Sequence, residues 1–111
     1  MKKLLVTGGC GYVGSLMIHK FINNYKIKNI DSQWFGNKLL ENQNLINIKE
    51  DIRNLKNNFI DDDTHAVVHL ANIANDPGVE LDQTLSWEVN VLAAKNLIEQ
   101  SINSGVKKFI Y

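Results

Sequence analysis

Four glycines lie within seven residues near the start of the sequence, in the segment TGGCGYVGS that runs from Thr7 to Ser15. A glycine-rich turn that opens a helix presents backbone N–H groups at the positive end of the helix dipole, where a diphosphate binds. The spacing fits both Gly-x-Gly-x-x-Gly from Gly9 and Gly-x-x-Gly-x-x-Gly from Gly8. In both, Gly11 lacks a side chain that would block phosphates, and Gly14 lets the helix approach the sheet. The alternative is a flexible turn that happens to be rich in glycine.

An acidic residue, Asp31, follows about twenty residues later, at the end of the next predicted strand. A carboxylate in this position can accept hydrogen bonds from the hydroxyls of an adenosine ribose. It would repel a ribose 2′-phosphate, and neither Ser32 nor Gln33 supplies a positive charge, so NAD is favoured over NADP. The alternative is an ordinary turn-forming aspartate. A P-loop is excluded, because no Gly-Lys-Ser/Thr follows the glycines.

The composition argues against several other classes of protein. Twelve Lys and Arg balance twelve Asp and Glu without a basic stripe, so nucleic acid is not an expected partner. The apolar runs are short and no signal peptide is evident, so we expect a cytoplasmic protein that makes no use of a membrane. A single cysteine, Cys10, excludes an internal disulfide and a cysteine-based metal site. We interpret His19, His65 and His69 as core or surface residues, and no metal site is predicted.

Hydrophobic periodicity predicts strands that alternate with helices. Strands are expected at 4–6, 25–30, 45–48, 66–70 and 106–111, and helices at 11–24, 54–60 and 84–104, with a further helical turn possible near 39–40. Met17 and Phe21 are expected on the inner face of the first helix. The period of the last helix is carried by Leu85, Val89, Leu92, Ala93, Leu97 and Ile102. This alternation favours a parallel sheet built from right-handed crossovers, with helices on both faces.

Six segments in order resemble the first half of an extended short-chain dehydrogenase/reductase, and more narrowly the NAD-dependent epimerase/dehydratase family that acts on nucleotide sugars. They are TGGCGYVGS, Asp31, EDIR (Glu50 to Arg53), VVHLANIA (Val67 to Ala74), WEVNVLAAKNLIEQS (Trp87 to Ser101) and GVKKFIY (Gly105 to Tyr111). The resemblance covers essentially the whole chain. It implies a three-layer, doubly wound Rossmann-type α/β fold with five strands in the order 3-2-1-4-5. Residues 1–111 would form the N-terminal portion of an NAD(P)-binding domain, incomplete relative to the full family domain.

The resemblance also implies a role for each cofactor-binding residue. The diphosphate would be held by Gly8, Gly11, Tyr12, Val13 and Gly14. Asp31 and Ser32 would hold the adenosine ribose, Asp51 would bond the adenine amino group, and Ile52 would pack on the ring. The ribose on the nicotinamide side would be lined by Leu70, Ala71, Asn72 and Ala74, in a loop braced by Asn90. Two residues depart from the family pattern: Asn72 replaces a usual Ala or Gly, and Cys10 a usual Ala or Ser.

In the family, a Tyr-x-x-x-Lys pair transfers the proton while hydride passes to the nicotinamide. None of the three tyrosines here is followed by lysine four positions later, so no catalytic residue is predicted. We therefore expect residues 1–111 to bind NAD without catalysing a reaction. The full-length parent would also bind a nucleotide sugar. Two alternatives stay open: a nucleotide-binding or regulatory module that pairs with a partner chain or a second copy, and a truncated product that lacks its C-terminal half. The sugar and the reaction (epimerisation, dehydration or reduction) stay open as well.

Overall fold

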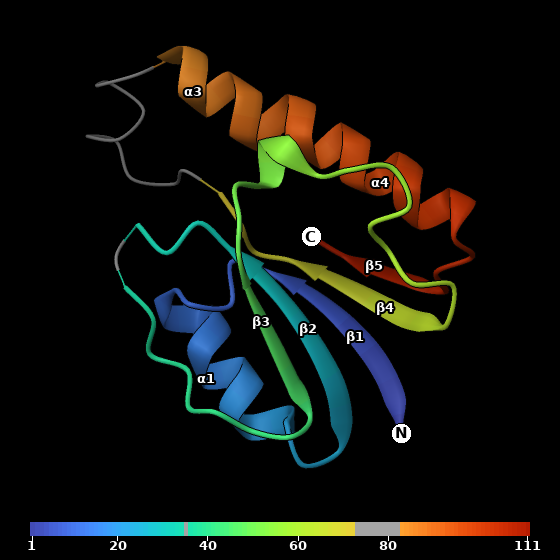
Figure 1. Ribbon diagram of the computed structural model, residues 1–111. Coiled ribbons are helices and arrows are strands. Elements are labelled where there is room, and N and C mark those ends of the chain that lie inside the picture. The colour runs from blue at the N-terminus through green and yellow to red at the C-terminus, as the bar shows by residue number, and fades with distance from the viewer. Residues whose placement is uncertain (35, 73–82) are drawn as a thin grey trace.

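A five-stranded parallel sheet forms the centre of the molecule, with the strand order β3-β2-β1-β4-β5 (Figure 1). The computed structural model describes residues 1–34, 36–72 and 83–111. The strands are β1 (Lys2–Thr7), β2 (Tyr25–Asp31), β3 (Leu45–Lys49), β4 (Thr64–His69) and β5 (Lys108–Ile110). Every neighbouring pair in this sheet is parallel. The predicted fold class and strand order are confirmed.

Helices cover both faces of the sheet (Figure 1). One face is covered by α1 (Tyr12–Phe21). A continuous helical segment covers the other face and consists of α3 (Gln83–Trp87), a π-helix (Glu88–Ala93) and α4 (Ala94–Asn103). A short 3₁₀ helix (Ile52–Asn54) follows β3. Since α1 and the α3–α4 segment lie on opposite sides of the sheet, the architecture has three layers.

Alternate residues of β1 pack into two separate hydrophobic cores, one on each face of the sheet. Leu4 and Val6 pack toward α1, in a cluster with Ile18, Ile22, Ile27, Ala66 and Val68. Leu5 points to the opposite face, in a cluster with Ile30, Ile52, Leu55, Ile60, Val67, Val89, Ala93 and Leu97. A strand in the middle of a parallel sheet is buried on both faces, so it reads as an unbroken apolar run rather than an alternating one.

The inner face of α1 differs from the prediction. Ile18 and Ile22 are buried, whereas Met17 is only partly buried and Phe21 is 36% exposed. Apolar residues occur on almost every side of this helix, so periodicity alone does not identify the inner one. The face is decided instead by Gly14, where the helix backbone touches the glycine turn; Ile18 and Ile22 follow it at intervals of four residues.

The predicted helix at 54–60 is wrong. Only the 3₁₀ helix Ile52–Asn54 forms, and Asn58 has a φ of +63°, which a right-handed helix does not contain. The side chain of Asp51 accepts a hydrogen bond from the Arg53 N–H and so caps this short turn. Three asparagines in the segment add to its low helix propensity. No helical turn forms near 39–40, where the Asn37 side chain bonds the Leu39 N–H instead.

The period of the last helix also changes within the π-helix. A π-helix has wider turns than an α-helix, so it shifts the residues that follow to a new face. Val89, Ala93 and Leu97 are buried as expected, but Leu92 is 49% exposed and Ile102 is 72% exposed. The other ends differ from prediction by a few residues: α1 stops at Phe21, and β5 spans only Lys108–Ile110.

Thr7 joins the ends of β1 and β4. Its hydroxyl oxygen accepts hydrogen bonds from the N–H groups of Leu70 and Ala71, both at 3.1 Å, and lies 2.6 Å from Nδ1 of His69. The Leu70 N–H is shared with the Thr7 backbone carbonyl at 2.9 Å. With two N–H groups directed at its oxygen, the hydroxyl is oriented to donate its proton to Nδ1. A neutral His69 that carries its own proton on Nε2 fits this arrangement.

We expect this arrangement to make stability depend on pH. Burial lowers the pKa of His69 below its ordinary value of 6.5. The unfolded chain therefore takes up a proton on His69 more readily than the folded chain does. The contribution of neutral His69 to the free energy of unfolding is complete above pH 6.5 and is lost as the pH falls below that value. The free energy of unfolding, measured by urea denaturation, should decrease from pH 7 to pH 5. His69→Asn keeps an acceptor for Thr7 but does not titrate, so it should flatten the dependence of the free energy of unfolding on pH. The control His65→Asn should leave most of that dependence in place. Equal slopes in the two variants would contradict this role of His69.

Candidate functional site

The glycine turn lies at the carboxyl edge of the sheet, where the strand order reverses. β1 is flanked by β2 on one side and by β4 on the other, and the turn at residues 8–11 connects β1 to α1. In open parallel sheets this switch point is the usual place for a ligand. Two neighbouring strands contribute groups that contact the turn here. The side chain of Asp31 comes from the end of β2, and the backbone of Leu70 and Ala71 follows β4.

The four glycines have different roles. Gly8 has a φ of +76°, and a Cβ there would lie 2.7 Å from the backbone nitrogen of Ala71. A Cβ at Gly9 would overlap the Asn29 side chain, and one at Gly14 would lie 2.5 Å from the carbonyl oxygen of Gly8. At Gly11 the nearest atom would be 3.4 Å away, an ordinary contact. The fold therefore requires glycine at 8, 9 and 14, whereas Gly11 is exposed and has room for a Cβ.

Most N–H groups of the turn are bonded within the protein. Gly8 donates to the Ile30 carbonyl at 2.9 Å, and Gly11 donates to the Gly8 carbonyl at 3.2 Å. Gly9 donates to Oδ1 of Asn29 at 2.8 Å, and Cys10 donates to Oδ2 of Asp31 at 2.9 Å. These four groups are thus not available to a diphosphate.

The donors that remain belong to the first turn of α1. The N–H groups of Tyr12, Val13 and Gly14 have no acceptor in the part of the chain that the structure describes, and the N-cap residue Gly11 contributes no side chain. Unpaired N–H groups at a helix start form an anion site together with the helix dipole. Because the side chains of Tyr12 and Val13 are largely exposed, these two residues would act mainly through their backbone.

Asp31 is oriented toward the turn. Its Oδ1 accepts a hydrogen bond from the Gln33 N–H at 2.7 Å, and its Oδ2 accepts the one from Cys10. Each carboxylate oxygen can accept a second hydrogen bond. The half-buried carboxylate can therefore still bind the two hydroxyls of a ribose. Its neighbour Ser32 is half-buried as well.

Asp51 is engaged by Arg53. The carboxylate accepts hydrogen bonds from the Arg53 N–H at 2.9 Å and from its guanidinium group at 2.6 to 3.1 Å, and these bonds lower the pKa of Asp51. The guanidinium also donates to Glu88 in the π-helix at 2.9 Å. Ile52 is 6% exposed within the core. The roles predicted for Asp51 and Ile52 at an adenine ring stay predictions, and Asp51 has little acceptor capacity beyond its bonds to Arg53.

The loop after β4 is described as far as Asn72. Thr7 fixes the backbone of Leu70 and Ala71, and Asn72 is exposed. Ala74 lies outside the described residues. Asn90 lies half-buried in the π-helix. Its expected support of the loop stays a prediction, because most of that loop is not described.

Sequence reasoning missed several residues that build this edge. Thr7, Asn29 and Asn47 shape the turn, and Arg53 and Glu88 connect two elements beside it. One signal was present for Asn29: it is a polar residue within the apolar run of β2, between Ile27 and Ile30. The contacts of the other four residues cross between elements that are distant in sequence, so no local pattern reveals them.

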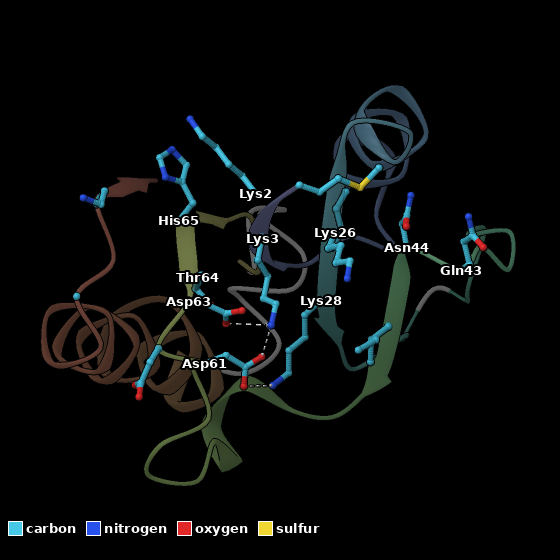
Figure 2. A pocket seen from close by; sticks show the side chains of 16 residues that line it. Lys2, Lys3, Lys26, Lys28, Gln43, Asn44, Asp61, Asp63, Thr64 and His65 are labelled. Carbon is cyan, nitrogen blue, oxygen red and sulfur yellow. Dashed lines mark hydrogen bonds and ion pairs between the residues drawn. The ribbon is translucent and has the colours of Figure 1, made fainter.

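Two pockets differ in their distance from the glycine turn: the first is remote from it, and the second has in its lining Asn37 and Asn47, which contact Cys10 of the turn. One of about 610 Å³ lies at the opposite edge of the sheet, among the amino ends of the strands (Figure 2). There Lys3 pairs with Asp63 at 2.9 Å, and Asp61 lies 3.4 Å from Lys3 and 3.8 Å from Lys28. A second pocket of about 690 Å³ lies between residues 37–43 and β3. Within the described ranges, no helix is long and apolar enough to span a bilayer, and no group of His, Cys, Asp and Glu is arranged to hold a metal ion.

Several proteins are similar to this chain. A curated protein of Methanocaldococcus jannaschii, provisionally named a UDP-glucose 4-epimerase, is 31% identical over 97% of this chain and 36% of its own length. The UDP-N-acetylglucosamine 4-epimerase of Methanobrevibacter ruminantium, solved with UDP-N-acetylmuramic acid, is 30% identical with a TM-score of 0.91, over 99% of this chain and 37% of that one. The Bordetella bronchiseptica enzyme WbmH, solved with NAD⁺, is 28% identical with a TM-score of 0.87, over 100% and 38%.

This chain thus spans little more than a third of the length of those relatives. A family model, described as the NAD dependent epimerase/dehydratase family, matches residues 4–111. The resemblance predicted from the six sequence segments is confirmed, and the cofactor predicted with it is the one in the family's description. The chain belongs to the NAD dependent epimerase/dehydratase family.

Proposed function

We propose that the chain binds NAD at the carboxyl edge of its sheet. The observation that carries this proposal is the pairing of two groups with spare hydrogen-bonding capacity. The unpaired N–H groups of Tyr12, Val13 and Gly14 can bind a diphosphate, and the Asp31 carboxylate can bind the adjoining ribose. The bond from Cys10 to Asp31 ties the two together, so they are presented to one ligand.

We further propose that this is the cofactor-binding part of a nucleotide-sugar epimerase or dehydratase. The similar structure of WbmH holds NAD⁺, and that of the Methanobrevibacter ruminantium enzyme holds UDP-N-acetylmuramic acid. Bound NAD would accept a hydride from a sugar. The residues described here would supply binding and orientation: the helix start would donate hydrogen bonds to the diphosphate, and the loop after β4, held by Thr7, would lie beside the nicotinamide end.

We infer a preference for NAD over NADP. A ribose 2′-phosphate would approach the carboxylate of Asp31, and two negative charges in contact repel each other. Asp31 cannot readily turn away, because both its oxygens hold backbone N–H groups of the fold. Gln33 and Ser32, the next residues along the chain, supply no positive charge that would attract the phosphate.

Gly11→Val tests the diphosphate site. The variant should fold normally, since a Cβ at this position makes only an ordinary contact with Gly8 and the backbone is extended (φ −75°, ψ 179°). Its valine side chain would stand in front of the α1 N–H groups and should lower NAD affinity by about tenfold or more. Isothermal titration calorimetry measures the affinity, and unchanged affinity would show that the helix start is not the diphosphate site.

Gly14→Ala is the matched control for that variant. The added methyl group would lie 2.5 Å from the Gly8 carbonyl oxygen and 2.6 Å from the Gly9 Cα, both backbone atoms. Overpacking of this kind costs about 1–3 kcal/mol. We therefore expect Gly14→Ala to lower the free energy of unfolding in urea, whereas Gly11→Val should change it by less than about 1 kcal/mol. The pair separates loss of binding from loss of folding.

Asp31→Asn tests the ribose site and the choice of cofactor. The wild-type chain should bind NAD at least about tenfold more tightly than NADP. The asparagine removes the negative charge, so binding of NAD should weaken while the ratio of the two affinities falls toward one. Competition calorimetry with both cofactors measures this ratio. A ratio that does not change on substitution would mean that Asp31 does not contact the ribose.

A further inference from the structure

The interior of β2 contains a polar side chain with no exposed surface, that of Asn29. Its Oδ1 accepts the hydrogen bond from the Gly9 N–H at 2.8 Å, and its Nδ2 donates to Oδ1 of Asn47 on β3 at 2.8 Å. Only an oxygen can accept from the Gly9 N–H, so the partners at both ends fix which way the carboxamide points. Cys10 completes the surroundings, with its Sγ 3.7 Å from Nδ2 of Asn29.

Asn29 and Gly9 are matched in shape as well as in hydrogen bonding. A Cβ at Gly9 would overlap the Asn29 side chain and the Ile18 methyl group. The backbone of the turn therefore lies directly on the carboxamide. Asp31 follows Asn29 by two residues, so it projects from the same face of β2, and it holds the next N–H group, that of Cys10. One face of one strand thus binds two consecutive peptide groups of the turn.

An aliphatic side chain of similar size at this position would fill the same space but would leave the buried Gly9 N–H without an acceptor. A buried carboxamide is itself costly unless all its groups are bonded. The Nδ2 group of Asn29 meets this requirement through Asn47, a second polar residue on β3, and through Sγ of Cys10 in the turn. What the pair adds to simple packing is a directional bond to the Gly9 peptide.

We propose that Asn29 is a positioning residue for the diphosphate: it fixes the Gly9 peptide so that the start of α1 has its binding orientation before the cofactor arrives. Asn47 assists by fixing the carboxamide of Asn29. A turn that is already ordered loses less conformational entropy when the ligand binds, which raises affinity. This inference rests on the proposed NAD site and goes beyond it, because Asn29 itself would not touch the cofactor.

Asn29→Leu and Asn47→Leu test the inference through two ligands that differ in the diphosphate. We expect Asn29→Leu to lower NAD affinity about tenfold, because the turn must then be ordered when the cofactor binds. Affinity for adenosine, which lacks phosphates, should stay within about twofold, since it depends on Asp31 rather than on the turn. Asn47→Leu should show a smaller loss in the same direction. Calorimetry measures NAD, and NMR titration measures the weaker adenosine.

Ile60→Val is the matched control, because it weakens the core on the opposite face of the sheet without touching the turn. It should reduce stability and leave both affinities unchanged at temperatures where the chain is folded. Equal losses of NAD and adenosine affinity in Asn29→Leu, or no loss of NAD affinity, would overturn the inference.

Hydrogen exchange of the Gly9 N–H separates this inference from the proposed function. The group should be protected in the ligand-free wild type and should exchange faster in Asn29→Leu than in Ile60→Val. If the wild type failed to bind NAD, the proposed function would fall, and the exchange rates alone would then decide whether Asn29 orders the turn. Equal exchange in Asn29→Leu and Ile60→Val would overturn that role.

Discussion

The site depends on the contact between the backbone of α1 and the glycine turn. At Gly14 the helix approaches so closely that no Cβ fits between it and the Gly8 carbonyl. This contact aims the helix start along the end of β1 and places Ile18 and Ile22 over the sheet. The unpaired N–H groups of the first turn are therefore held at the carboxyl edge by packing of the helix body. Apolar burial and the ligand binding proposed above would use opposite ends of one helix.

The turn bonds some of its hydrogen-bond donors within the protein and leaves others for the proposed ligand. The N–H groups of residues 8 to 11 are bonded to backbone carbonyls or to side chains of β2, and those of residues 12 to 14 have no acceptor among the described residues. Bonding inside the protein keeps the turn ordered, because a glycine-rich segment otherwise has the most conformational freedom to lose. The dipole then acts on an anion from a fixed distance. Of the residues expected to hold the diphosphate, Gly8 and Gly11 have their N–H groups bonded within the protein, and their role toward a diphosphate stays a prediction.

The sequence allowed most of the fold to be predicted, because strands buried on both faces appear as short apolar runs and glycines mark the first crossover. The parallel sheet with helices on both faces followed from that alternation, whereas the strand order was implied by the resemblance to the family. The errors lie where local pattern is ambiguous: the inner face of α1 is chosen by Gly14, and the segment after Ile52 is capped by Asp51 rather than helical. For the site, Gly11 and Asp31 are visible in sequence because their spacing is regular. Asn29 and Thr7 act across strands, so their partners become known only when the strands are placed side by side.

Polar side chains join the elements at the carboxyl edge, in addition to apolar contacts such as those of Ile52 and Val89. Thr7 joins β1 to the loop after β4, and Asn29 joins β2 to the turn. Arg53 joins the 3₁₀ helix after β3 to Glu88 in the π-helix that also carries Asn90. Apolar contacts tolerate small displacements, whereas hydrogen bonds lose most of their strength when distance or angle changes. An edge joined in this way keeps hydrogen-bond donors and acceptors at fixed positions. Recognition of a dinucleotide requires such fixed positions, and apolar packing in a hydrophobic core does not provide them by itself. The π-helix, a form that is frequent at functional sites, fits this pattern, since it displaces residues 88–93 from the regular helical face at this edge.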